Sequence, residues 1–195
     1  MANHIRFSLD IDGVVANFNE ALTTLARDLN YRPRAQPTEQ PGKYVLVSDT
    51  DRLDAWIDEH SEEFWGGLEP MATEADHTAI RRALAQGHEL FWASARPSHR
   101  QHDLRNITLQ WLQTHDFPVN EQHLLLGDKG QIVRAQGITA HLDDRVSHAI
   151  RVALSGVTCY MITRPWNIEE VRYGGYDFLL VDSIEEYITL VTAGE

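Results

Sequence analysis

The chain has 195 residues, with 17 lysine and arginine residues against 29 aspartate and glutamate residues, which gives a formal net charge of −12. Proteins that bind long nucleic acids neutralise many phosphates with a basic face, so this charge balance argues against such a partner. No apolar run reaches about 18 residues, the length that a membrane-spanning helix needs, and the N-terminus lacks the pattern of a secretory signal. With one cysteine, Cys159, no internal disulfide forms. We therefore expect a cytoplasmic protein in which Cys159 is a small buried hydrophobe.

The first half of the chain predicts one strand followed by helices, because its apolar residues change from a strand-like to a helical spacing. A stretch rich in proline and glutamine, typical of a loop, separates the first helix from the next. The expected elements, in chain order, are a strand over residues 5–9, a helical stretch after Asp12 that ends near Asn30, a loop over 31–42, a helix over 51–63 and a helix over 73–86 that Gly87 closes.

The second half predicts a regular alternation of strands and helices. The expected elements are a strand over 89–93, a helix from about His99 to His115, a strand over 123–126, a short helix from Lys129, a strand over 138–142, a helix from Arg145, strands over 157–161 and 176–181, and a helix over 184–191. Such alternation predicts an α/β fold with a Rossmann-like parallel sheet flanked by helices. We expect residues 1–18 and 70–195 to form this core, with a small, mainly helical cap inserted after the first strand over 19–69.

Two carboxylates lie at the carboxyl end of the first strand. Asp10 and Asp12 are two residues apart, so their side chains point to the same side of an extended segment, and Gly13 allows a sharp turn directly after them. Crowded carboxylates repel one another unless a cation lies between them, and oxygen ligands suit Mg²⁺. One of the pair can act as a nucleophile and the other as a proton donor.

Three later segments end in polar residues where strands or helix starts are expected. Ser94 and Arg96 follow the strand over 89–93 and offer a hydroxyl and a guanidinium for a phosphate. Lys129 opens a helix, and Asp143 and Asp144 follow the strand over 138–142. Because the carboxyl ends of parallel strands meet at one edge of the sheet, we expect all of these groups to gather there.

This set of motifs resembles that of the haloacid dehalogenase superfamily of phosphohydrolases: an Asp-x-Asp, a Ser or Thr, a Lys and an acidic pair, in that order. The resemblance implies a Mg²⁺-dependent phosphomonoesterase in which Asp10 is the nucleophile and Asp12 is the general acid and base. Mg²⁺ would be held by Asp10, by the backbone carbonyl of Asp12 and by Asp144, the last as the third protein ligand. Phosphate would be bound by Ser94, Arg96 and Lys129, with Asp143 as the partner of Lys129, although the two adjacent aspartates could exchange roles.

Within that superfamily the chain looks like the 5'(3')-deoxyribonucleotidase branch, also called cytosolic type C 5'-nucleotidases. The similarity is carried by residues 10–18, by Phe64-Trp65-Gly66-Gly67-Leu68-Glu69-Pro70, by Leu142-Asp143-Asp144-Arg145 and by Arg164-Pro165-Trp166-Asn167. It implies a (deoxy)nucleoside monophosphate as substrate, a phosphoaspartate intermediate, and Phe18, Tyr44 and Trp65 as substrate-binding residues. Phe18 fits base stacking and plain packing equally well. Two departures are the Ser94-Ala95 pair, where mammalian members have Thr-Ser, and a poor match over residues 31–52.

Several alternatives remain open at this stage. A polynucleotide 3'-phosphatase has similar motifs, but the chain lacks the phosphate loop of a kinase partner and its acidic charge opposes a polynucleotide track. A sugar-phosphate phosphatase would use the same core with different cap contacts. A catalytically silent binding protein on this scaffold is disfavoured because both Asp12 and Lys129 are present. The sequence leaves the oligomeric state open.

Overall fold

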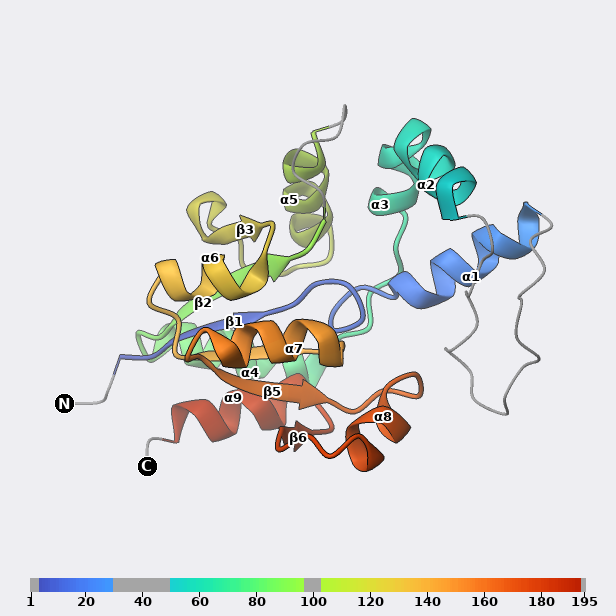
Figure 1. Cartoon of the computed structure of the whole chain (residues 1–195). Helices are drawn as coiled ribbons and strands as arrows, with labels where there is room; N and C mark the ends of the chain where they lie inside the picture. The colour runs from blue at the N-terminus through green and yellow to red at the C-terminus, as the bar shows by residue number, and fades with distance from the viewer. Residues whose placement is uncertain (1–3, 30–49, 97–102, 194–195) are drawn as a thin grey trace.

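The computed structural model describes residues 4–29, 50–96 and 103–193. Within these residues six strands form one parallel sheet in the order β3-β2-β1-β4-β5-β6 (Figure 1). The strands are β1 (Arg6–Leu9), β2 (Glu89–Ser94), β3 (Leu124–Leu126), β4 (Ala140–Asp143), β5 (Thr158–Ile162) and β6 (Leu179–Val181). The predicted α/β class and parallel sheet are confirmed.

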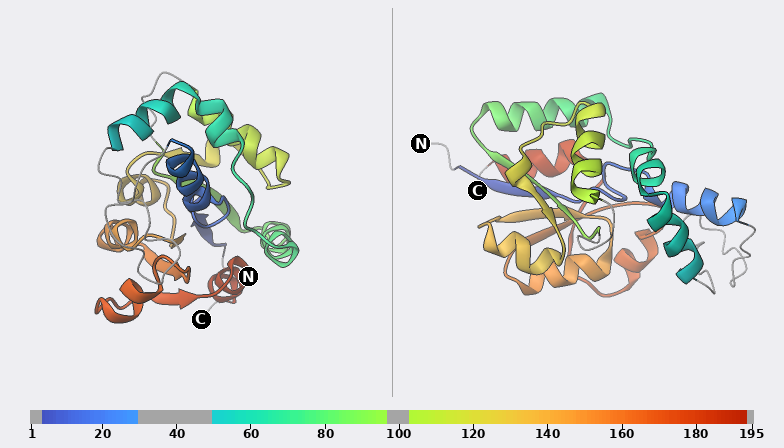
Figure 2. Two further views of the ribbon diagram at one scale, coloured as in Figure 1. Left: turned by 90° about the vertical axis from the view of Figure 1, so that its right-hand side faces the viewer. Right: turned by 90° about the horizontal axis from the view of Figure 1, so that it is seen from above.

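Helices cover both faces of the sheet. The helices of the described residues are α1 (Phe18–Asp28), α2 (Thr50–Glu59), α3 (Ser61–Gly66), α4 (Glu74–Ala85), α5 (Leu104–Thr114), α6 (Lys129–Ala135), α7 (Val146–Leu154), α8 (Ile168–Tyr173) and α9 (Ile184–Thr192), with a short 3₁₀ turn over Glu121–His123. Figure 2 shows α6 and α7 on one face and α4 and α9 on the other. In the described part of the chain, no helix has the length and apolar character needed to cross a bilayer.

Alternation along the central strands gives each face its own core. Phe7 and Leu9 of β1 and Leu142 of β4 pack in the cluster beneath α4, α5 and α9. The adjacent residues Ser8 of β1 and His141 of β4 point to the opposite face, which α6 and α7 cover, and both are fully buried. Because side chains repeat every second residue, Asp10 and Asp143 continue this second row toward the carboxyl edge of the sheet.

The loop after β1 makes a tight turn at that edge. Gly13 has a φ of +87°, a backbone conformation that favours glycine, and Ala16 bridges to Pro70, the residue that leads back into the core. Helix α1 then runs outward from the sheet, and α2 and α3 lie beyond the same edge (Figure 1). These three helices stand between β1 and α4 in the chain and border the carboxyl ends of the central strands.

Four sequence predictions differ from the structure. The helix expected over 51–63 is divided into α2 and α3, because the Ser61 hydroxyl donates to the Ile57 and Asp58 carbonyls and competes with the helical backbone bonds. The helix expected from about His99 begins at Leu104, because Asp103 accepts the amide hydrogen of Asn106 and caps it. The strand expected over 176–181 forms only over its last three residues, and α8 was not expected. The loop over 31–42 lies outside the described residues.

Candidate active site

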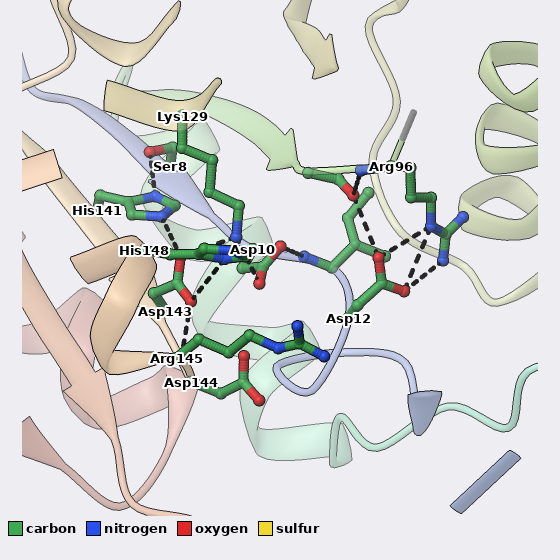
Figure 3. A network of polar contacts seen from close by, with 12 residues as sticks. Ser8, Asp10, Asp12, Arg96, Lys129, His141, Asp143, Asp144, Arg145 and His148 are labelled. Atoms are coloured by element: carbon green, nitrogen blue, oxygen red, sulfur yellow. Dashed lines mark hydrogen bonds and ion pairs between the residues drawn. The ribbon is translucent and has the colours of Figure 1, made fainter. Parts of the chain in front are cut away.

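Lys129 is the centre of a buried ion-pair cluster at the carboxyl edge of the sheet (Figure 3). Its Nζ lies 2.6 Å from Asp10 Oδ2 and 2.8 Å from Asp143 Oδ2. Asp10 follows β1, Asp143 ends β4, and Lys129 is the first residue of α6, whose N-terminus Asp128 caps by accepting the Gln131 amide. The cap therefore fixes the helix start that carries the ammonium group between the two carboxylates.

The cluster holds more negative than positive charge. Asp10, Asp143 and the neighbouring Asp144 are all buried, and Lys129 is the one lysine or arginine in the described part of the chain that forms an ion pair with any of them. Burial raises the pKa of Asp10 well above its usual value, although Lys129 opposes the shift. Burial acts in the same direction on Asp143, but Lys129, His141 and His148 together outweigh it and lower the pKa of that carboxyl. Lys129 stays protonated, since the carboxylates raise its pKa against the effect of burial.

Asp144 is the least satisfied member of this group. Its Oδ2 accepts the indole hydrogen of Trp166 at 2.7 Å, whereas its Oδ1 is buried without a hydrogen-bond partner among the described residues. A Cβ on Gly13 would lie 2.0 Å from Asp144 Oδ2, so the absence of a side chain there lets the carboxylate approach the turn after Asp12. Burial, followed by the charge of Asp143, raises the pKa of Asp144 to about 7.

The residues present fit a hard divalent cation such as Mg²⁺. An orphaned buried carboxylate oxygen, an excess of buried negative charge and an all-oxygen donor set are the features that such an ion satisfies. Asp10, Asp143 and His148 also offer ligand atoms within 4.8 Å of one another. Lys129 pairs with both Asp10 and Asp143, whereas Asp144 Oδ1 has no donor among the described residues, so Asp144 is the carboxylate most available to such an ion.

Asp12 points away from Lys129 and is held by a different cation. Arg96 Nη2 donates to Asp12 Oδ1 at 2.7 Å, and Arg96 Nε donates to Oδ2 at 3.0 Å. The Ser94 hydroxyl also donates to Asp12 Oδ2, at 3.2 Å. Ser94 and Arg96 were both expected to bind phosphate; here they lie beside the proposed acid and base.

Two histidines complete the network and were not identified from the sequence. His141 is fully buried; its Nδ1 is 2.8 Å from Ser8 Oγ and its Nε2 is 3.0 Å from Asp143 Oδ2. Burial lowers the pKa of His141 below its usual value. The position of Ser8 and His141 two residues before Asp10 and Asp143 is the signal that could have revealed them. His148 of α7 lies 3.7 Å from Asp143 Oδ1, and burial lowers its pKa to about 4.

A small cavity of about 120 Å³ opens onto these groups. It is lined by the carboxylates and cations of the site and by two aromatic side chains: Asp10, Asp12, Phe18, Trp65, Ala95, Arg96, Lys129, Arg145 and His148. Phe18 and Trp65 stack with ring centroids 5.5 Å apart, and the Arg145 guanidinium carbon is 5.7 Å from the Phe18 centroid. The structure thus brings Phe18 and Trp65 to the cavity, whereas Tyr44 lies outside the described residues.

A larger cavity of about 520 Å³ lies beside α1 and contains none of the Asp10, Asp143 or Lys129 groups. Its charged lining is acidic, with Glu20, Asp28, Glu63 and Glu69. Such a wall repels a phosphate. The smaller cavity is therefore the better candidate for a phosphoryl site despite its size.

Comparison with known proteins identifies the fold. No family model and no curated protein matches the sequence. A haloacid dehalogenase family hydrolase from Deinococcus radiodurans, with bound phosphate and sodium, superposes with a TM-score of 0.61 at 13% identity over 99% of this chain and 97% of that one. A haloacid dehalogenase-like protein from Streptococcus pneumoniae gives 0.63 at 12% identity over 98% and 100% of the two chains.

An enzyme of known substrate is also similar. The D,D-heptose 1,7-bisphosphate phosphatase from B. bronchiseptica, complexed with magnesium and phosphate, gives a TM-score of 0.57 at 11% identity over 98% of this chain and 99% of that one. At these identities the similarity establishes a shared fold over nearly the whole length. The predicted haloacid dehalogenase fold is therefore confirmed, and the activity is argued from the site.

Proposed function

We propose that the chain is a Mg²⁺-dependent phosphomonoesterase. The observation that carries the proposal is the buried cluster in which Lys129 joins Asp10 to Asp143 beside the unpaired Oδ1 of Asp144. A buried carboxylate oxygen without a donor is uncommon in folded proteins, and a bound ion is one explanation for it. Crowded carboxylates around one ammonium group, at the edge of the sheet where α/β proteins bind ligands, suit a phosphoryl group and a metal ion.

The proposed reaction has two in-line displacements on phosphorus. A carboxylate oxygen of Asp10 attacks the phosphorus of the ester, the bond from phosphorus to the leaving oxygen breaks, and Asp12 gives that oxygen a proton, so an alcohol departs. Water then attacks the phosphoaspartate and gives its proton to Asp12, and the bond between phosphorus and Asp10 breaks. Inorganic phosphate is released and both aspartates return to their starting states.

The surrounding groups support these steps. Lys129 stabilises the negative charge of the phosphoryl oxygens and orients Asp10, while Asp143 and His141 hold Lys129 in place. The Ser94 hydroxyl donates to the Asp12 carboxylate and so helps to hold the proposed acid and base. Mg²⁺ bound by Asp10, Asp144 and the Asp12 carbonyl would supply further neutralisation of charge in the transition state.

For the substrate we propose a (deoxy)nucleoside monophosphate, with residues 19–69 acting as a cap. Phe18, in the first turn of α1, and Trp65 of α3 line the cavity, and their rings stack on each other. Base stacking on aromatic rings tolerates any base. A sugar phosphate is the second candidate, because the heptose bisphosphate phosphatase has the same fold, although a sugar gains less from an aromatic wall.

The test is a phosphate-release screen with the purified protein. Nucleoside monophosphates, sugar phosphates and 3'-phosphorylated oligonucleotides are compared, each with Mg²⁺ and with excess chelator. We expect release from monophosphates that requires the metal, with nucleotides giving the highest kcat/KM. Full turnover in chelator would refute the metal assignment, and a preference for sugar phosphates or oligonucleotides would refute the nucleotide assignment while leaving the phosphatase proposal intact.

A further inference from the structure

Two side chains at the end of β2 donate to the Asp12 carboxylate, Ser94 and Arg96, and Arg96 makes the shorter contacts. Arg96 Nη2 donates to Oδ1 at 2.7 Å, and Arg96 Nε lies 3.3 Å from Oδ1 and 3.0 Å from Oδ2. A guanidinium bound to both oxygens of a carboxylate fixes its plane as well as its position. The Asp12 side chain, 16% exposed, is thus held at the cavity by a fully buried cation.

Arg96 is itself held from three directions. Its Nη1 donates to Thr108 Oγ1 of α5 at 2.9 Å, and Thr108 in turn donates to the Leu104 carbonyl. Its backbone amide donates to Ser94 Oγ at 3.1 Å. Its guanidinium carbon lies 4.6 Å from the Trp65 ring centroid, within the range of a cation–π contact. All three guanidinium nitrogens therefore have a protein acceptor, and two of them, Nε and Nη2, donate to Asp12.

We infer that Arg96 is a positioning residue for the proton-transferring carboxylate Asp12, rather than a phosphate ligand, with Thr108 and Trp65 setting the orientation of its guanidinium. The inference rests on the phosphomonoesterase proposal. A general acid must lie within hydrogen-bond reach of the leaving oxygen in a defined direction. Arg96 fixes the orientation of the Asp12 carboxylate. Because the Arg96 guanidinium also contacts Trp65 of α3, the position of α3 affects that orientation.

A residue that positions Asp12 and a residue that binds phosphate affect different substrates when they are replaced. Nitrophenolate is a stable leaving group and departs with little help from an acid, whereas the alkoxide of a sugar or nucleoside needs a proton as it leaves. Misplacing Asp12 should therefore slow the cleavage of alkyl phosphates much more than that of nitrophenyl phosphate. Loss of a phosphate contact should weaken both esters alike, because they present the same phosphoryl group.

The experiment compares kcat and KM of the purified protein with Mg²⁺ for nitrophenyl phosphate, thymidine monophosphate and glycerol phosphate. Arg96→Lys keeps the charge but removes the two-point contact; we expect the ratio of alkyl to aryl kcat/KM to fall about 10-fold or more, since general acid catalysis contributes about 10²–10⁴-fold in all. Asp12→Asn should give the largest fall in this ratio. Thr108→Val, which removes the acceptor of Nη1, should give a smaller fall in the same direction.

Arg81→Lys is the matched control, because Arg81 forms an exposed ion pair with Glu74 on α4, outside the site; its ratio should equal that of the wild type. Equal losses on all esters in Arg96→Lys, or a raised KM with unchanged kcat on all of them, would overturn the inference and restore the phosphate role. If circular dichroism shows that Arg96→Lys is unfolded, an unchanged ratio in folded Thr108→Val overturns it instead. A wild-type protein inactive on every ester would refute the phosphomonoesterase proposal itself.

Discussion

Two buried aspartates of this protein have opposite surroundings. Asp76, in the first turn of α4, accepts hydrogen bonds from the Thr73 amide and hydroxyl at 2.9 and 2.8 Å, and from the Glu185 amide at 2.9 Å. Asp144, after β4, accepts one from Trp166, and its other oxygen has no donor among the described residues. Both residues are buried, since Asp76 is 5% exposed and Asp144 is 1% exposed.

The difference separates a structural carboxylate from a functional one. Asp76 forms a capping box and joins the start of α4 to the start of α9, so each of its oxygens contributes to the fold. An unpaired buried acceptor costs about 1–3 kcal/mol, and the protein retains that cost at Asp144. Substitution of Asp144, at a strand end, should therefore mainly change activity, and substitution of Asp76, in α4, should mainly change stability.

The largest effect is expected at the nucleophile. Asp10→Asn should lower kcat by about three orders of magnitude or more, because an amide does not attack phosphorus. The fold should be retained, since Asp143 still pairs with Lys129. Steady-state phosphate release and a circular dichroism melt measure the two properties. Near-normal turnover of the folded variant would mean that the nucleophile is another residue.

Asp144→Asn should abolish the response to Mg²⁺. In chelator its melting temperature should equal or exceed that of the wild type, because the substitution removes an uncompensated buried carboxylate. Added Mg²⁺ should raise the melting temperature of the wild type but not of the variant, since a bound ion stabilises the state that holds it. Differential scanning calorimetry with and without the ion is the measurement.

The adjacent residue provides the control for Asp144. Asp143→Asn breaks the pair with Lys129 and the contact with His141, and breaking a buried pair typically destabilises a protein by about 3–5 kcal/mol. We expect a marked fall of its melting temperature in chelator. Equal changes of melting temperature in Asp143→Asn and Asp144→Asn would contradict the assignment of Asp144 to the metal and of Asp143 to Lys129.

Asp76→Ala should reduce stability without changing the chemistry. The variant loses the capping box and the bond to the Glu185 amide, and we expect the free energy of unfolding to fall by about 1–3 kcal/mol. Values of kcat and KM measured well below the melting temperature should equal those of the wild type. Urea unfolding followed by fluorescence measures the first quantity. A loss of kcat in the folded variant would show that α4 reaches the active site.

The sequence predicted the fold because periodicity and motif position are local properties. The alternation of strands and helices, with a motif at strand ends, was enough to expect a parallel sheet and to bring Asp10, Lys129 and Asp143 together. The side-chain partners were not predictable in the same way. Arg96 reaches Asp12 across 84 residues and His141 reaches Ser8 across 133, and such pairs depend on the register between strands, which no local pattern specifies.

The smallest expected effect concerns the base. Phe18→Ala should raise KM for thymidine monophosphate by about 10-fold, within the range of base–aromatic stacking measured by alanine substitution, and should change KM for glycerol phosphate much less, because that ester has no ring to stack. A base can stack on this face of Phe18 only if Arg145 moves, since the Arg145 guanidinium carbon is 5.7 Å from the Phe18 ring centroid. The Arg145 side chain is exposed and forms no ion pair with any described residue, so it can move into the solvent. Steady-state kinetics on the two esters measures both values. Equal changes in KM would assign Phe18 to the packing of Phe64 and Trp65, which its ring also contacts, and would leave base recognition to other residues.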